Sequence, residues 1–326
     1  MSTSAAAQVR SVRSQLTEER CRALADKGYA IIDNCMGEAC ADALLTEMQE
    51  AFDQGLMKPN KTHFSKPGGG GVMVFQKPGI FETDMHDTAL QGQLPVLTSL
   101  FEQTALVDAL ESRLPDVKLR RGTQGCTVKL QHNTGSGGCF PWHYDNPGRP
   151  NKRRLTCLLY LNRGWQPGDG GELTLLPFLG LAQEVAPLFD RLVVFRSDLV
   201  LHRVRPARAP RYALTVWLDG ADGCVNGDRD VALHFSKADL GPGGDWLGLC
   251  DRLKASPVQR VLSRGVYQEE YQASLAECMG GAEGEGEMLA AHMAQVRAMD
   301  ASAPLRHLVQ RLRATRELLA LQNLAT

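Results

Sequence analysis

The sequence of 326 residues contains no apolar run that approaches the ~20 residues needed to cross a bilayer. It also lacks an excess of charge of either sign, because 36 Lys and Arg residues stand against 37 Asp and Glu residues. A general binder of nucleic acid or acidic membranes is expected to be more basic. We therefore expect neither partner. With 43% hydrophobic and 22% charged residues, the composition is that of a globular protein with ample material for a core.

No CxxC pair occurs among the nine cysteines, and the first 15 residues contain no apolar stretch of the secretory type. We therefore expect an intracellular protein of the cytoplasm or nucleus, with free thiols. Residues 1–15 are rich in Ser and Ala and contain no acid. Two interpretations of them stay open, namely a flexible leader and an organelle-targeting segment.

Helical support is expected over residues 16–120. Thr17 is placed to cap a helix that ends at Gly28, and a short strand follows at residues 29–32. Apolar residues at helical spacing predict a second helix over residues 38–53, and a third is expected over residues 96–114. Residues 58–71 end in four glycines and are interpreted as a mobile loop.

From about residue 121 to residue 220 the pattern changes to short β segments separated by Gly and Pro. The clearest segments are residues 126–131, 155–162, 172–177, 191–195, 199–204 and 212–218. Helices precede and follow this block instead of alternating with it, which favours a double-stranded β-helix (jelly roll) over a parallel sheet. We expect one folded domain over residues 16–235.

Residues 236–326 are expected to form a helical extension, with helices over residues 268–279, 287–299 and 302–323. Leu305, Leu308, Val309 and Leu312 share one helical face. That face has two interpretations: it binds a partner or a second copy of the chain, or it docks on its own domain.

Two histidines and one aspartate form the candidate metal site. His143 and Asp145 are separated by one residue and would lie on the same face of a strand. This pair alone is weak, because an exposed His and Asp are common on strands. His202 would supply a third ligand from a distant strand. Two His and one carboxylate leave coordination positions open and are typical of non-haem Fe(II) oxygenases.

The strand that begins at Arg211 has one mixed face, which carries Arg211, Thr215 and Trp217, and one apolar face. An inward-facing Arg needs a buried anion, and a carboxylate is its best partner. Tyr160, on another strand, would offer its hydroxyl to the same carboxylate. The alternatives are an Arg that points into solvent and a core Tyr that is bonded elsewhere.

These motifs occur in a fixed order along the chain: His143-Tyr-Asp145-Asn-Pro147, Leu155-Thr-Cys-Leu-Leu-Tyr160-Leu-Asn162, Gly170-Gly-Glu-Leu173, Asp190-Arg-Leu-Val-Val-Phe195, His202 and Arg211-Tyr-Ala-Leu-Thr-Val-Trp217. Their order and spacing resemble the prolyl 4-hydroxylase-type superfamily of 2-oxoglutarate- and Fe(II)-dependent oxygenases. The likeness is greatest to the hypoxia-inducible-factor prolyl hydroxylase branch, and it is strong over about residues 126–219.

The resemblance implies an assignment for each of these residues. His143, Asp145 and His202 match the iron ligands. Arg211 matches the residue that binds the distal carboxylate of 2-oxoglutarate, with Tyr160 assisting and Thr215 in the pocket near the metal. The family tends to have a pocket Tyr where this chain has Gln131 and His132. Either one of these two residues replaces it, or the contact is lost.

The resemblance implies a dioxygenase that uses Fe(II), O2 and 2-oxoglutarate, with ascorbate as an auxiliary reductant, and that releases succinate and CO2. We expect a protein or peptide substrate, with peptidyl proline as the leading candidate. The alternatives are a small-molecule 2-oxoglutarate oxygenase and a non-catalytic metal-binding interaction protein.

Overall fold

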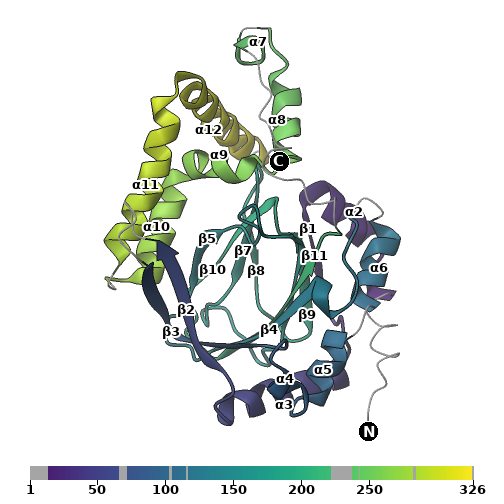
Figure 1. Ribbon diagram of the computed structural model, residues 1–326. Coiled ribbons are helices and arrows are strands. Elements are labelled where there is room, and N and C mark those ends of the chain that lie inside the picture. Colours follow the sequence, from purple (N-terminus) through teal and green to yellow (C-terminus); the bar gives the residue numbers. More distant parts are fainter. Residues whose placement is uncertain are drawn as a thin grey trace.

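A computed structural model describes residues 14–65, 72–102, 105–114, 117–221, 237–241, 243–281 and 284–324. The fold is mainly β, with two antiparallel sheets that face one another and helices on both outer sides (Figure 1). This arrangement confirms the expected jelly-roll core with flanking helices and a helical C-terminal extension. Within the described residues, no helix is both long and apolar enough to cross a membrane.

The larger sheet has seven strands and forms one wall of the jelly roll. In spatial order these strands are β1 (Tyr29–Ile32), β9 (Arg191–Arg196), β6 (Arg153–Tyr160), β11 (Arg211–Asp219), β4 (Cys126–Asn133), β3 (Val72–Asp84) and β2 (Lys58–Ser65). The smaller sheet has four strands in the order β5 (Phe140–His143), β10 (Val200–Val204), β7 (Leu173–Pro177) and β8 (Gln183–Val185).

N-terminal helices cover the outer face of the larger sheet. They are α2 (Glu18–Lys27), α3 (Glu38–Asp53), α4 (Thr88–Gln91), α5 (Pro95–Glu102) and α6 (Ala105–Arg113). Thr17 caps α2 and Gly28 ends it at a φ of 80°, as predicted. The apolar face of α3 and the even-numbered positions of β11, such as Leu214 and Leu218, belong to the same buried core. The opposite face of β11 is thereby turned towards the interior of the jelly roll.

The C-terminal helices lie against the outer face of the smaller sheet (Figure 1). They are α7 (Lys237–Leu240), α8 (Trp246–Lys254), α9 (Gln259–Val266), α10 (Gln268–Met279), α11 (Glu285–Ala301) and α12 (Ala303–Leu324). Leu308, Val309 and Leu312 of α12 are buried among α9, α11 and their neighbours. The face that they share therefore docks on its own chain, and self-association through it is not supported.

Two local predictions were wrong. Residues 58–65 form β2, because pairing with β3 satisfies their backbone groups, with Lys58 opposite Glu82. Residues 66–71, the rest of the predicted loop, lie outside the described residues. The helix expected over residues 96–114 is two helices, α5 and α6. Of the possible leader, residues 1–15, the first 13 residues also lie outside the described part of the chain, and Ser14 and Gln15 are helical.

The expectation that all cysteines are free thiols is contradicted by a disulfide between Cys139 and Cys278. These residues are 139 positions apart in sequence. They meet because α10 packs directly on β5, whose first residue follows Cys139. Sequence spacing alone does not reveal such a long-range pair.

Candidate active site and metal centre

The two strands β5 and β10 bring the three candidate metal ligands together. His143 and His202 are direct cross-strand neighbours, and Asp145 lies two residues beyond His143, past the end of β5. One Asp145 carboxylate oxygen lies 3.6 Å from His143 Nε2 and 3.7 Å from His202 Nε2. The three ligand atoms lie within 4.8 Å of one another. A two-His, one-carboxylate face of this size fits a single divalent metal ion.

Backbone carbonyls orient both imidazole rings. Nδ1 of His143 lies 2.7 Å from the carbonyl oxygen of Pro141, and Nδ1 of His202 lies 3.2 Å from that of Val200. Each Nδ1 therefore carries the proton, and each Nε2 lone pair faces the site. Burial, and then the neighbouring His143, lower the pKa of His202 to about 4, which keeps the ring neutral. A neutral imidazole is the form that binds metal.

Two donors hold the second oxygen of Asp145. The Thr156 hydroxyl donates to it at 2.7 Å, and the Trp217 indole N–H donates at 2.9 Å. Burial alone raises the pKa of Asp145, but the adjacent His202 and His143 and the Trp217 N–H reverse that effect and hold the pKa well below its usual range. The carboxylate is thus charged, with one oxygen fixed by the protein and the other directed at the histidines.

The Trp217 contact leads to a prediction about metal affinity. Trp217→Phe keeps an aromatic ring but removes the N–H donor, so the carboxylate is less firmly oriented. We expect the dissociation constant for a divalent metal to rise by about 10-fold or more, as measured by chelator competition. Trp246→Phe is a matched control, since its N–H donates to Thr315 at the same 2.9 Å within the C-terminal helices. Equal affinities in the two variants would contradict the orienting role.

Arg211 lies deep in the interior beside Tyr160. Its Nε donates to the Gly171 carbonyl at 2.9 Å, and one terminal nitrogen lies 3.5 Å from the Gln131 side-chain oxygen. A Cβ at Gly171 would come 2.7 Å from Arg211 Cδ, so this glycine makes room for the arginine. The Tyr160 hydroxyl is fully buried and has no hydrogen-bond partner among the described residues. A buried cation beside a buried unpaired hydroxyl fits the carboxylate of a small acid.

Gln131 and His132 point to opposite faces of β4. Gln131 lines the cavity that contains the metal ligands. His132 stacks between Phe52, at 4.3 Å, and Tyr212, at 4.2 Å, on the helix-covered face. Burial lowers the pKa of His132 to about 4. Of the two residues left open by the sequence, Gln131 is therefore the one that faces the cavity with the metal ligands.

A cavity of about 120 Å³ joins the metal ligands to Arg211. Thr215 and Ala213 lie between the two ends on β11, and apolar side chains of Leu158, Leu173 and Val204 complete the wall. The mouth is polar: Glu82 of β3 accepts from Asn60 of β2 at 2.5 Å and from Lys129 at 2.8 Å. The β2–β3 hairpin thus borders the site through side chains that the sequence did not single out.

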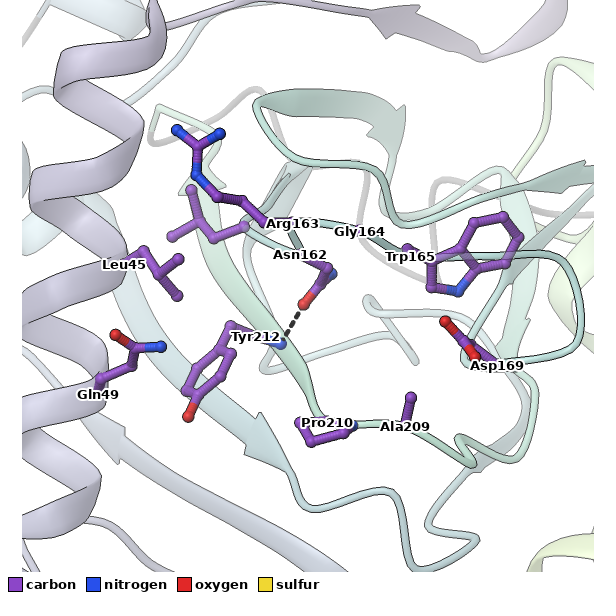
Figure 2. A pocket seen from close by; sticks show the side chains of 11 residues that line it. Leu45, Gln49, Asn162, Arg163, Gly164, Trp165, Asp169, Ala209, Pro210 and Tyr212 are labelled. Atoms are coloured by element: carbon purple, nitrogen blue, oxygen red, sulfur yellow. Dashed lines mark hydrogen bonds between the residues drawn. The ribbon is translucent and has the colours of Figure 1, made fainter.

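A second cavity, of about 310 Å³, lies away from the metal ligands, between α3 and the loop after β6 (Figure 2). Tyr212 borders it, and the backbone N–H of Tyr212 donates to Asn162 at 2.6 Å. Arg163 at its edge is paired with Asp42 at 2.7 Å. Among the described residues, the His143, Asp145 and His202 group is the only metal-ligand cluster of three or more, so this cavity is not the metal centre.

The comparisons with known proteins agree with this geometry. Residues 128–219 match the 2OG-Fe(II) oxygenase superfamily. A solved prolyl 4-hydroxylase structure from Phytophthora capsici is 45% identical, covers 98% of this chain and 97% of its own, and has a TM-score of 0.82. The chain belongs to the prolyl 4-hydroxylase-type 2-oxoglutarate- and Fe(II)-dependent oxygenases.

Other oxygenases of this type match a smaller part of the chain. Human Egl nine homolog 1 is 38% identical over 235 residues, which are 67% of this chain and 51% of that protein. A Trichoplax adhaerens prolyl hydroxylase, solved in complex with a hypoxia inducible factor oxygen degradation domain peptide fragment, is 27% identical. It covers 69% of this chain and 94% of its own, with a TM-score of 0.51.

As an oxygenase of this family, the protein uses Fe(II), O2 and 2-oxoglutarate. Bound iron supplies the activation of O2, and 2-oxoglutarate leaves as succinate and CO2 while the substrate is hydroxylated. The chain's own contribution is to orient two imidazoles and one carboxylate, to offer a buried cation, and to surround the space between them with apolar groups that exclude water.

Proposed function

We propose that this oxygenase hydroxylates proline residues in a protein or peptide. His143, Asp145 and His202 hold Fe(II), and Arg211 and Tyr160 hold the distal carboxylate of 2-oxoglutarate. Gln131 and Thr215 line the space between them. The observation that carries the proposal is that one cavity contains the metal ligands at one end and the buried Arg211 at the other.

The substrate assignment is supported by the relatives. The Phytophthora capsici structure covers almost the whole chain and is a prolyl 4-hydroxylase. The Trichoplax adhaerens enzyme was solved with a peptide bound. Polar groups also line the cavity: Asn60, Glu82 and Lys129 place amide, carboxylate and ammonium groups there, which are the kinds of group that hydrogen-bond to a peptide backbone.

A peptide library tests the function directly. The full chain, with Fe(II), O2 and 2-oxoglutarate, is incubated with peptides that contain a single proline, and with matched peptides in which alanine replaces that proline. We expect a +16 Da product on proline peptides only, together with one succinate per hydroxylation. Hydroxylation of other residues, or succinate formation that is stimulated only by small molecules, would contradict a peptidyl-proline substrate.

A further inference from the structure

A groove of about 560 Å³ lies between the metal site and the C-terminal helices. His143 and Pro147 form its jelly-roll side. Arg260 and Arg264 of α9, Tyr271 of α10, and Gln295 and Met299 of α11 line its helical side. Because His143 lines both this groove and the metal cavity, the groove lies directly beside the metal site.

The charge of this groove is positive. Two of the described residues that line it are arginines, and none is Asp or Glu. Arg264 stacks on the Tyr271 ring at 4.4 Å, and Arg260 donates to the Asn146 backbone oxygen at 3.0 Å. Within the described residues, no carboxylate forms an ion pair with Arg264. The stacking holds the guanidinium plane in place while leaving its N–H edge for an anion.

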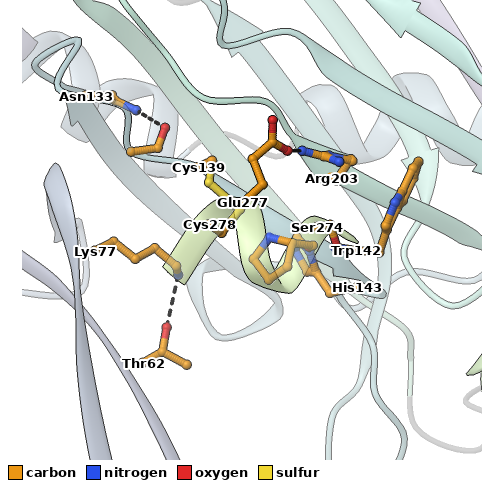
Figure 3. Close-up of a disulfide and its surroundings, with 12 residues drawn as sticks. Thr62, Lys77, Asn133, Cys139, Trp142, His143, Arg203, Ser274, Glu277 and Cys278 are labelled. Carbon is orange, nitrogen blue, oxygen red and sulfur yellow. Dashed lines mark hydrogen bonds and ion pairs between the residues drawn. A yellow bond between two sulfur atoms is a disulfide. The ribbon is translucent and has the colours of Figure 1, made fainter. Parts of the chain in front are cut away.

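The helices that form the groove are fixed to the strand that carries His143. The Trp142 backbone N–H donates to the Ser274 hydroxyl at 3.2 Å, and the Tyr144 and Ser263 hydroxyls are 2.7 Å apart. Arg203 pairs with Glu277 beside the Cys139–Cys278 disulfide (Figure 3). The groove is therefore preformed, so that little ordering is needed when a ligand binds.

We propose that this groove binds an acidic side chain of the peptide substrate, a few residues away from the proline that is hydroxylated. This inference rests on the proposed function. A guanidinium recognises a carboxylate through paired hydrogen bonds, and the groove supplies two guanidiniums beside the metal ligand His143. The C-terminal extension thereby contributes to substrate specificity, and Arg264 is the residue that favours peptides with an acidic side chain.

Peptide binding tests the proposal without turnover. Labelled peptides with one proline carry Asp, Asn or Lys at a single position, which is scanned along both sides of the proline. They are titrated with the full chain by fluorescence anisotropy. We expect wild-type protein to bind the best Asp peptide about 10-fold more tightly than its Asn counterpart, and the difference to shrink as salt is added.

Charge reversal distinguishes recognition from loss of fold. Arg264→Glu should lose the preference for Asp and bind the Lys peptide more tightly than wild-type protein does, which an unfolded variant cannot do. Arg297→Glu is the matched control, because Arg297 is exposed on α11 outside the groove. It should keep the wild-type preference. An unchanged Asp preference in Arg264→Glu, or no Asp preference at any position in wild-type protein, would overturn the proposal.

Mass spectrometry of the same peptides separates this inference from the proposed function. Charge-dependent binding without a +16 Da product on proline would support the proposed role of the groove and contradict the proposed proline substrate. Proline hydroxylation at equal rates on Asp, Asn and Lys peptides would support the proposed function and contradict the proposed role of the groove. Absence of both binding preference and product would reject both.

Discussion

Replacing His202 with Ala is expected to abolish succinate formation, and His143→Ala and Asp145→Ala should do the same. Each supplies one of only three protein ligands within a 4.8 Å cluster, and a three-ligand site has no spare donor. His202 is 3% exposed. An exposed side chain of the described residues therefore cannot reach its position and take its place as a metal ligand. The measurement is succinate release from 2-oxoglutarate with added Fe(II), alongside metal content after dialysis.

His307→Ala is the control for these ligand variants, since His307 is exposed on α12. It should retain wild-type metal content and turnover. A metal content near one per chain in His202→Ala, together with wild-type succinate release, would remove His202 from the site. Wild-type protein purified in air is expected to carry some Zn²⁺, because Zn²⁺ binds such ligand sets more tightly than Fe²⁺.

The sequence was sufficient to predict the β core because its strands are short, apolar on one face and separated by Gly and Pro. The alternation along β11 correctly placed Arg211 and Thr215 on the interior face and Leu214 on the helix-covered face. The same alternation placed Trp217 on the interior face, but nothing in the sequence indicated that Trp217 and Thr156 both donate to Asp145. Those bonds depend on the bend after β5, which is set by tertiary contacts.

Tertiary pairing also explains what the sequence did not reveal about the site mouth. β2 is polar at nearly every position, so it has no strand-like alternation. It becomes a strand because β3 offers an unpaired edge, and only then do Asn60 and Glu82 meet at the cavity. Similarly, nothing in the pattern of α9 indicated that Arg264 would face His143 across a groove, since that depends on how α10 packs against β5.

Arg211→Ala is expected to raise the 2-oxoglutarate concentration required for half-maximal turnover by about 100-fold or more. Removing one member of a buried ion pair costs about 3–5 kcal/mol, and each 1.4 kcal/mol is tenfold in affinity. Arg211 is 3% exposed, so water cannot take over the contact. Because Nε of Arg211 is already bonded to the Gly171 carbonyl, the guanidinium is held ready and little ordering is needed on binding.

Arg211→Lys should recover only part of the loss. A lysine retains the charge, but it cannot donate to the Gly171 carbonyl and to a carboxylate with the same fixed geometry. Arg205→Ala is the matched control, because Arg205 pairs with Glu184 at the surface and should leave the 2-oxoglutarate requirement unchanged. Titration of 2-oxoglutarate at saturating Fe(II) measures all three variants. An unchanged requirement in Arg211→Ala would mean that the cosubstrate carboxylate binds elsewhere and that Tyr160 and Arg211 serve only the core.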